Sequence, residues 1–317
     1  MRETGDNFTL VEYLPLLESN PQKNSHPLKG AFYFLLGVLA YSIANVFIKT
    51  SSEYYPLGEM VILRGLIFFI PLTFYILIRH FKHLSSVFST SHLKIHAFQG
   101  ILSAFCLYFL FYAFDLMPLS DATAISFSET FIITLLSFFF FKEPIKLKNW
   151  LAITLGFGGV LIITKPFTAP FTLHLKPALA CVLAVTFDAL VLLSFRKIVK
   201  QDRILTILFY YALFSTLGGM IFTPFETWVP LIQDHVWDIL GLGVFGALGQ
   251  SFLVLAFRQA SPAFLAPLIY TQLLWSLLFD EMIWNQPPSS SLILGSFIII
   301  FSGIYLLKHT KSHAPLK

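Results

Sequence analysis

Long apolar segments recur along the whole chain, and they limit its possible folds more than any other feature. A helix needs roughly 20 apolar residues to cross the hydrocarbon core of a bilayer. Runs of about this length are separated by short polar or proline-marked links. They occupy residues 30–48, 57–78, 96–114, 119–141, 148–165, 175–195, 204–224, 237–257, 262–284 and 291–307. The pattern predicts an all-α membrane protein with ten transmembrane helices.

The composition supports this prediction. Hydrophobic residues make up 56% of the chain and charged residues only 12%, too few to cover a soluble surface. The formal net charge of +4 comes from Lys and Arg in the links, so it indicates membrane topology and no nucleic-acid partner. Cys106 and Cys181 lie inside predicted spans, which argues against a structural disulfide.

The distribution of positive charge predicts the topology. With the N-terminus inside, 17 of the 21 Lys and Arg fall in cytoplasmic links or tails, whereas Lys49, Lys165 and Lys176 fall outside and Arg64 lies within a span. Positive residues accumulate on the cytoplasmic side of membrane proteins. Residues 1–28 lack a signal-peptide pattern. We expect cytoplasmic tails at 1–28 and 311–317 and a multi-pass chain in a bacterial inner membrane.

The chain contains an internal repeat. The stretch 118–166 matches the stretch 261–310, and a shift of 143 residues places Glu129 over Gln272. We therefore divide the chain into two repeats, 29–166 and 167–310. Each repeat holds five spans, an odd number, so the second must be inverted relative to the first. Inverted repeats of this kind predict alternating access at the interface between them.

Short motifs in both halves match a known group of proteins. They are PLSDATAISFS at 118–128, FFKEP at 140–144, GFGGVLIITKP at 156–166, APLIYTQLLW at 266–275, QPP at 286–288 and GSFIIIFSGIYLL at 295–307. Through them the chain resembles the drug/metabolite transporter superfamily, in its ten-helix branch with two EamA domains. The SFS and KE motifs and the stretch FRKIVKQDRILTILFYYA at 195–212 also resemble S-adenosylmethionine uptake carriers of intracellular bacteria.

Three departures from the family pattern leave the substrate open. Glu129-Thr130 stand where family members usually carry proline, and Gln286 stands where they carry an acid. Asp280-Glu281 replace small or aromatic residues. The resemblance implies a metabolite carrier, and its alternatives are an S-adenosylmethionine uptake carrier, an amino-acid exporter or a drug exporter.

Polar residues inside the spans are the candidates for substrate binding. Charged groups in a bilayer core cost a few kcal/mol each and usually serve transport or pair with one another. Glu129 and Gln272 lie near the middle of the fourth and ninth spans, and Arg64 lies in the outer part of the second. Glu129 has the alternative of a helix–helix hydrogen bond. Arg64 has three: pairing with Glu129, binding an anion, or extending to the interface.

Asn45, Tyr270 and Trp275 complete the predicted substrate site, because amides orient ligands and aromatic faces bind cationic or planar groups. The candidates for proton or cation coupling are Glu129, Asp188, Asp280 and Glu281. Asp188 has a helix–helix contact as its alternative. Adjacent residues point about 100 degrees apart on a helix, so Asp280 and Glu281 cannot both face one cavity. An earlier helix end would make both solvated loop carboxylates.

Other functions have little support. No nucleotide-binding motif indicates direct coupling to ATP, and no HExxH or GxSxG motif indicates catalysis. An intramembrane enzyme acting on a lipid-linked substrate is the remote alternative. We predict no cofactor and no metal, and we expect the histidines around the link between the second and third spans to be solvated. The oligomeric state stays open, a homodimer included.

The sequence thus predicts a secondary active transporter for a small polar organic metabolite. Its partners would be that substrate and the lipid bilayer. Glu129 and the Asp280-Glu281 pair favour either a cationic substrate or proton coupling, and exchange of substrates is the other source of driving force.

Overall fold

The computed structural model describes residues 26–79, 84–141, 147–164, 171–222, 228–231, 235–260 and 262–310. Residues 1–25 of the predicted tail 1–28, the predicted tail 311–317 and most of the FFKEP motif at 140–144 lie outside these ranges. Within them the chain forms helices and no strand. They are α1 (Pro27–Ser51), α2 (Leu57–Arg79), α3 (Leu84–Phe88), α4 (Leu93–Leu116), α5 (Leu119–Ser126), α6 (Glu129–Phe141), α7 (Leu147–Thr164), α8 (Phe171–Gln201), α9 (Ile204–Gly219), α10 (Val236–Gln259), α11 (Pro262–Leu265), the 3-10 helix η5 (Ala266–Tyr270), α12 (Thr271–Trp284) and α13 (Ser290–Thr310).

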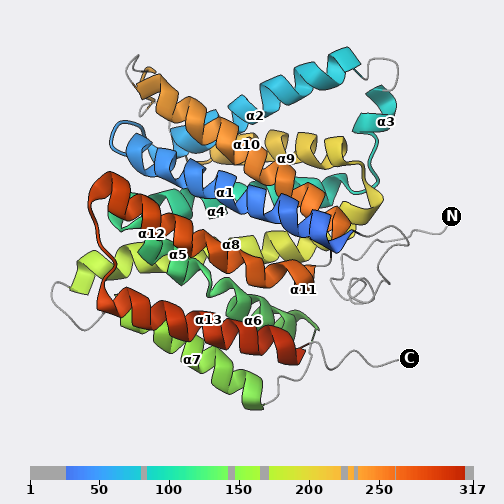
Figure 1. Cartoon of the computed structure of the whole chain (residues 1–317). Coiled ribbons are helices and arrows are strands. Elements are labelled where there is room, and N and C mark those ends of the chain that lie inside the picture. Colours follow the sequence, from blue (N-terminus) through green and yellow to red (C-terminus); the bar gives the residue numbers. More distant parts are fainter. Residues whose placement is uncertain are drawn as a thin grey trace, which may run out of the picture.

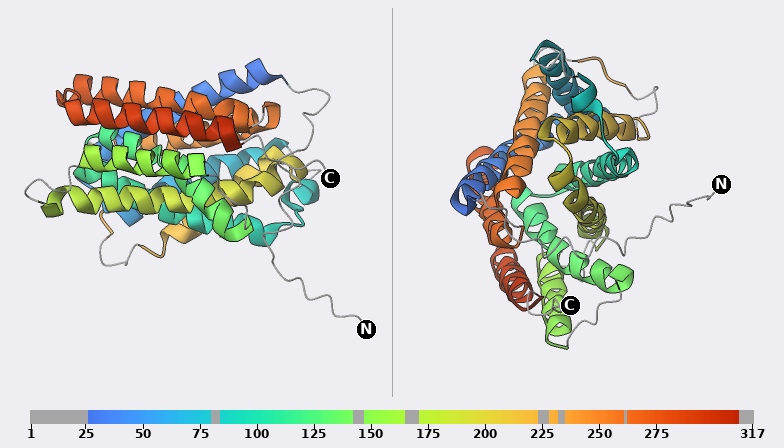
Figure 2. Two further views of the ribbon diagram at one scale, coloured as in Figure 1. Left: turned by 90° about the horizontal axis from the view of Figure 1, so that it is seen from below. Right: turned by 90° about the vertical axis from the view of Figure 1, so that its right-hand side faces the viewer.

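The helices form an elongated bundle with their axes roughly along one direction (Figures 1 and 2). One end, where α1 begins and α13 ends, carries Lys29, Lys94 and Arg258, and we call it the basic end. The opposite end, where α1 ends and α2 begins, is the far end. Among the described residues, six helical segments are long and apolar enough to cross a membrane, and three shorter helices are also apolar.

Apolar side chains cover the outside of the bundle as well as its core. Phe111, Phe114 and Phe131 are fully buried at the centre, whereas Phe297 and Phe301 on α13 are about two-thirds exposed. In a soluble protein, an outer surface this apolar would be costly. In lipid it is the expected surface, so the fold confirms the predicted all-helical membrane protein.

Two of the predicted spans are broken. The fourth divides at Phe127-Ser128 into α5 and α6, and the ninth divides through η5, which contains Pro267. At the break in the fourth span the backbone hydrogen bond joins residues three apart, where an α-helix joins residues four apart. The N–H of Ser128 donates to the carbonyl of Ile125 at 2.9 Å. The two breaks occupy equivalent places in the two repeats. Apolar length predicts spans and gives no sign of such breaks.

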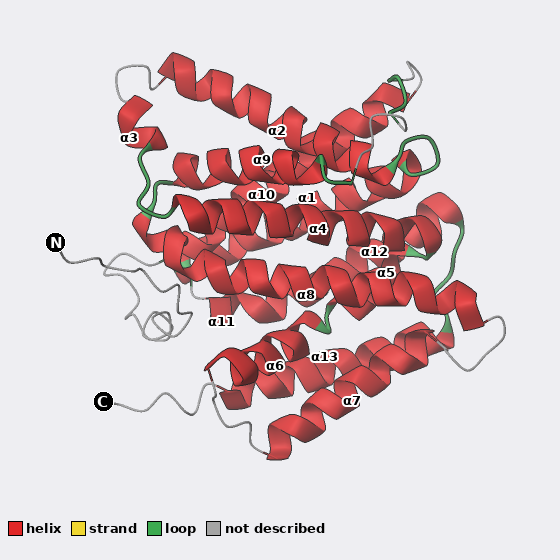
Figure 3. Cartoon of the chain, turned by 180° about the vertical axis from the view of Figure 1, so that it is seen from behind, coloured by secondary structure: helices red, strands yellow, loops and turns green. Residues whose placement is uncertain are grey.

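The packing has the symmetry of two inverted repeats. Helix α1 of the first repeat is equivalent to α8 of the second, and α4 is equivalent to α10. Accordingly, α1 packs along α10 and α8 packs along α4. In the same way, the contact of α4 with α9 corresponds to that of α10 with α2, while α2–α9 and α7–α13 pair across the axis itself. Figure 3 shows α4 and α8 side by side on one face. This pattern agrees with the predicted inverted five-helix repeats.

Equivalent positions follow from the helix bounds. Helices α4 and α10 both have 24 residues, follow a histidine (His92 and His235) and end before a residue with extended backbone. Helices α1 and α8 share a Leu-Lys pair at 28–29 and 175–176, followed by buried positions in nearly the same order. The pair α2 and α9 matches from the first residues, Leu57 and Ile204.

Candidate functional site

Arg64 is a buried cation without a carboxylate partner. It lies on α2 with 5% of its surface exposed, and its guanidinium interacts with the hydroxyls of Tyr41 on α1 and Tyr211 on α9. The guanidinium packs directly against Gly246 on α10, where an added Cβ would lie 2.6 Å from Nε. Among the described residues, no carboxylate lies within 4.0 Å of it. Tyrosine hydroxyls stabilise the guanidinium without neutralising it.

Two carboxyl groups lie within electrostatic range of each other on neighbouring helices. Glu129 is the first residue of α6, directly after the break, and Asp188 lies on α8; each interacts electrostatically with the other. Both side chains are only partly buried. No Lys or Arg of the described ranges forms an ion pair with either. The Cys106 thiol on α4 interacts electrostatically with both acids and with Arg64, so the acidic pair and the cation share it as a neighbour.

Polar groups on α1 and α10 extend the Arg64 side of the site. The Tyr41 hydroxyl donates a 2.6 Å hydrogen bond to Oε1 of Gln250 on α10. Asn45, predicted as a site residue, is buried one turn after Tyr41. The site thus combines carboxyl groups on α6 and α8 with Arg64, tyrosine and amide groups on α1, α2, α9 and α10.

The predicted residues of the ninth span lie around its break. The Tyr270 ring meets Phe127 edge-on at 4.8 Å between ring centroids, so the two helix breaks touch each other. Gln272 is partly buried in the first turn of α12. Trp275 packs against the apolar cluster of Phe34 and Val38 on α1. Tyr270 and Gln272 therefore lie at the junction of the repeats, and Trp275 contributes to helix packing.

Asp280 and Glu281 lie apart from the acidic pair, at the far end. Asp280 is 1% exposed and accepts hydrogen bonds from the backbone N–H groups of Leu119 and Ser120, at 3.1 and 2.7 Å. These N–H groups begin α5, where a negative charge is favourable. The Lys49 ammonium lies 3.9 Å from Asp280. Asp280 ties α12 to α5 and α1, whereas Glu281 is exposed.

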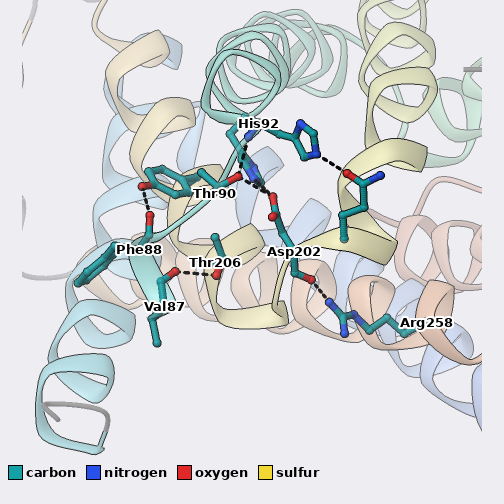
Figure 4. A network of polar contacts seen from close by, with 10 residues as sticks. Val87, Phe88, Thr90, His92, Asp202, Thr206 and Arg258 are labelled. Carbon is teal, nitrogen blue, oxygen red and sulfur yellow. Dashed lines mark hydrogen bonds and ion pairs between the residues drawn. The ribbon is translucent and has the colours of Figure 1, made fainter. Parts of the chain in front are cut away.

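A second polar network joins the helices at the basic end (Figure 4). Asp202 accepts hydrogen bonds from Thr90 at 2.8 Å and from Nε2 of His96 at 2.7 Å, and its carbonyl accepts one from Arg258. His92 contacts Gln201. His96 is buried, so the expectation of solvated histidines was wrong for this residue, because the turn between α8 and α9 covers it.

Sequence reasoning found the charged residues of the site and missed their partners. Tyrosine is common in this chain, with 12 residues, so Tyr41 and Tyr211 carried no distinguishing signal. Comparison of equivalent positions in the two repeats does distinguish these tyrosines. Three pairs of equivalent positions line the site with different chemistry: Tyr41 and Asp188, Arg64 and Tyr211, Glu129 and Gln272.

Comparisons with known proteins agree with the fold. The profile of the EamA-like transporter family matches residues 28–165 and again residues 175–308. A pseudopaline exporter of Pseudomonas aeruginosa is 27% identical, over 89% of this chain and 97% of its own. An S-adenosylmethionine uptake transporter of Rickettsia felis is 26% identical, over 90% and 94%. One crystal structure shares the fold with a TM-score of 0.60, 16% identity and coverage of 91% of this chain and 100% of its own.

Proposed function

The chain belongs to the EamA-like transporter family, and from this premise we propose that it moves a small zwitterionic organic metabolite across the bacterial inner membrane by alternating access. The chain is a multi-pass membrane protein and a transporter of that family. The substrate class, the site, the coupling and the orientation are the proposal. The basic end would face the cytoplasm, in accord with the distribution of Lys and Arg.

One observation carries the proposal: both signs of charge are present in the site, and neither is neutralised by a described side chain. Charges in a membrane interior are costly unless they are paired. A ligand that offers a carboxylate to Arg64 and an ammonium to Glu129 and Asp188 would pair both at once. A purely cationic or purely anionic ligand would leave one side uncompensated.

The acidic pair also supplies a means of proton coupling. A proton bound by Glu129 or Asp188 would remove the repulsion between their two like charges. A substrate ammonium bound between them would displace that proton. Binding of substrate and binding of a proton would then exclude each other, which is the condition for exchanging one for the other across the membrane.

The helix breaks support alternating access. Broken helices at the midplane are where inverted-repeat transporters bind their substrates. Glu129 begins α6 directly after one break, and Gln272 follows the other. In this proposal the tie of Asp280 to α5 would hold the far end closed, and the Asp202 network would hold the basic end closed. In this account the two ties open in turn.

S-adenosylmethionine is the most specific substrate candidate. A relative is named as its uptake transporter, and the molecule carries a carboxylate, an ammonium and a sulfonium. Amino acids are the second candidate, since they carry the first two groups. Both fit the charge arrangement.

Uptake by purified protein in proteoliposomes tests the proposal, with labelled S-adenosylmethionine and a panel of amino acids as probes. We expect saturable uptake of at least one zwitterion that changes when a pH gradient is imposed. The variant Glu129→Gln should reduce the response to the gradient about tenfold or more. Uptake of no zwitterion, together with uptake of a purely cationic probe, would contradict the proposed substrate class.

A further inference from the structure

A groove of about 300 Å³ lies between α4 and α8 on the outside of the bundle, close to the far end. Tyr108, Phe109 and Tyr112 line it from α4, and Ala180 lies among the α8 residues that line the other side. The α8 rim is open to the surroundings, because Leu179 and Leu183 are 52% and 45% exposed. In a membrane-spanning bundle this surface faces lipid.

The inverted repeat offers a built-in comparison for this groove. Its equivalent lies between α1 and α10, where Tyr33 stands in place of Ala180 and Phe252 in place of Phe109. The Tyr33 ring stacks on Phe252 with 6.4 Å between centroids. The ammonium of Lys29 lies 5.8 Å from the centroid of the same ring. Between α1 and α10 the protein itself places a flat apolar group, the Tyr33 ring, between a phenylalanine and a lysine.

Between α4 and α8 the phenylalanine and the lysine are retained, and Phe109 stacks on Phe187 of α8 with 6.0 Å between centroids, but Ala180 puts no ring at the position of Tyr33. Lys176 is the equivalent of Lys29, it is exposed, and no carboxylate of the described ranges pairs with it. The hydroxyls of Tyr108 and Tyr112 likewise have no hydrogen-bond partner among the described residues. The small methyl group of Ala180 leaves the space open. The groove therefore has a cation and two hydrogen-bond donors, and the space beneath them is not filled by an apolar side chain.

From this juxtaposition we infer that the groove binds an anionic phospholipid, with an acyl chain along Leu179, Leu183 and Phe109 and the phosphate at Lys176 and Tyr112. A lysine near the membrane interface is well placed for a headgroup. The acyl chain occupies the place that the Tyr33 ring fills between α1 and α10. The site is separate from the transported substrate, so it stands or falls independently of the proposed function.

Native mass spectrometry of the full chain tests the site, with phosphatidylglycerol and phosphatidylcholine of the same acyl chains added to the detergent-purified protein. The variant Ala180→Tyr fills the groove as Tyr33 does, and Lys176→Gln removes the cation. Lys29→Gln is the matched control, because it changes the equivalent lysine at the filled place. Since one lysine near an anionic headgroup contributes about 1 kcal/mol, Lys176→Gln should lower phosphatidylglycerol binding about fivefold.

We expect the wild type to retain phosphatidylglycerol more strongly than phosphatidylcholine, the two groove variants to lose that preference, and Lys29→Gln to keep it. Lys176 is exposed, so its variant tests the site even if Ala180→Tyr fails to fold. Equal retention of the two lipids by the wild type would overturn the inference. An unchanged preference in Lys176→Gln would overturn it as well.

Discussion

Two small clusters of side chains, here called corners, lie at opposite ends of the molecule and consist of equivalent positions of the two repeats. At the basic end, His96 bonds to Asp202 and His92 contacts Gln201. At the far end, the equivalents of His96 and Asp202 are Ile239 and Tyr55, which belong to one apolar cluster. His235 and Tyr54, the equivalents of His92 and Gln201, stack their rings at 3.6 Å. The same four positions meet in both corners, by polar contacts in one and largely by apolar packing in the other.

The repeat therefore determines which positions contact each other, whereas the residue types at those positions differ between the repeats. The difference is largest at the centre, where Arg64 faces its own equivalent, Tyr211, across the pair of α2 and α9. A symmetric pair of arginines would repel, and a symmetric pair of tyrosines would carry no charge. Divergence between the repeats therefore creates a site with two differently charged sides. Replacing residues by their repeat equivalents tests how much this divergence matters.

The largest effect is expected from Arg64→Tyr, which makes the α2 and α9 positions identical. It removes the only buried cation of the described site, so the substrate carboxylate loses its partner. Losing one member of a buried charge pair costs about 2–5 kcal/mol, so uptake at low substrate concentration should fall at least about 30-fold. Tyr211→Phe keeps the ring and the net charge and should cost only about fivefold, as for one hydrogen bond. Comparable uptake by Arg64→Tyr and the wild type would show that Arg64 binds no anion.

The next largest effect is expected from Glu129→Gln, which copies Gln272 into the first repeat. The amide cannot exchange a proton, so uptake driven by a pH gradient should fall about tenfold or more, as for the loss of a charged hydrogen bond. Glu281→Gln, a change to an exposed acid, is the control and should behave like the wild type. Proteoliposome uptake with and without the gradient measures both. A gradient response that persists in Glu129→Gln would place the coupling elsewhere.

These residues also mark how far the sequence alone could lead. Apolar length predicts the spans within a few residues, because crossing a bilayer sets a minimum that the composition must meet. It also isolates Arg64, Glu129 and Asp188, since charges within spans are rare. It does not reveal the breaks at Ser128 and η5, which depend on backbone hydrogen bonding and on contacts between repeats. The sequence predicts Asp280 and Glu129 alike as coupling candidates, because only the fold shows that Asp280 bonds to the start of α5.

A smaller effect is expected from Gly246→Ala. The added methyl group would lie 2.6 Å from Arg64 Nε, and the flexible arginine would move away from it. The protein should fold, while the apparent KM rises about tenfold because the cation is displaced from its binding position. Gly158→Ala is the matched control, since its Cβ would meet nothing within 4 Å. A changed KM in both variants, or in neither, would contradict the positioning role of Gly246.

The smallest effect is expected at the corners, and on stability. Asp202→Asn weakens the bonds to His96 and Thr90, at about 1–3 kcal/mol, and should lower the melting temperature by several degrees. Ile239→Val at the equivalent place of the far end removes one buried methylene group and should cost about 1 kcal/mol. Thermal unfolding in detergent compares the two. If Ile239→Val destabilises the protein more than Asp202→Asn, the polar corner is not the stronger of the two.

Ligand-induced thermal stabilisation with matched sets of compounds tests whether the divergent repeats build a site for a zwitterion. Each set contains an amino acid, or S-adenosylmethionine, with its decarboxylated and its deaminated analogue. Ligands that bind only the folded state raise the melting temperature. We predict stabilisation by the complete compound of at least one set and little by either analogue, and in Arg64→Tyr the complete and decarboxylated compounds should become alike. Stabilisation by an analogue equal to that by its complete compound would contradict the account.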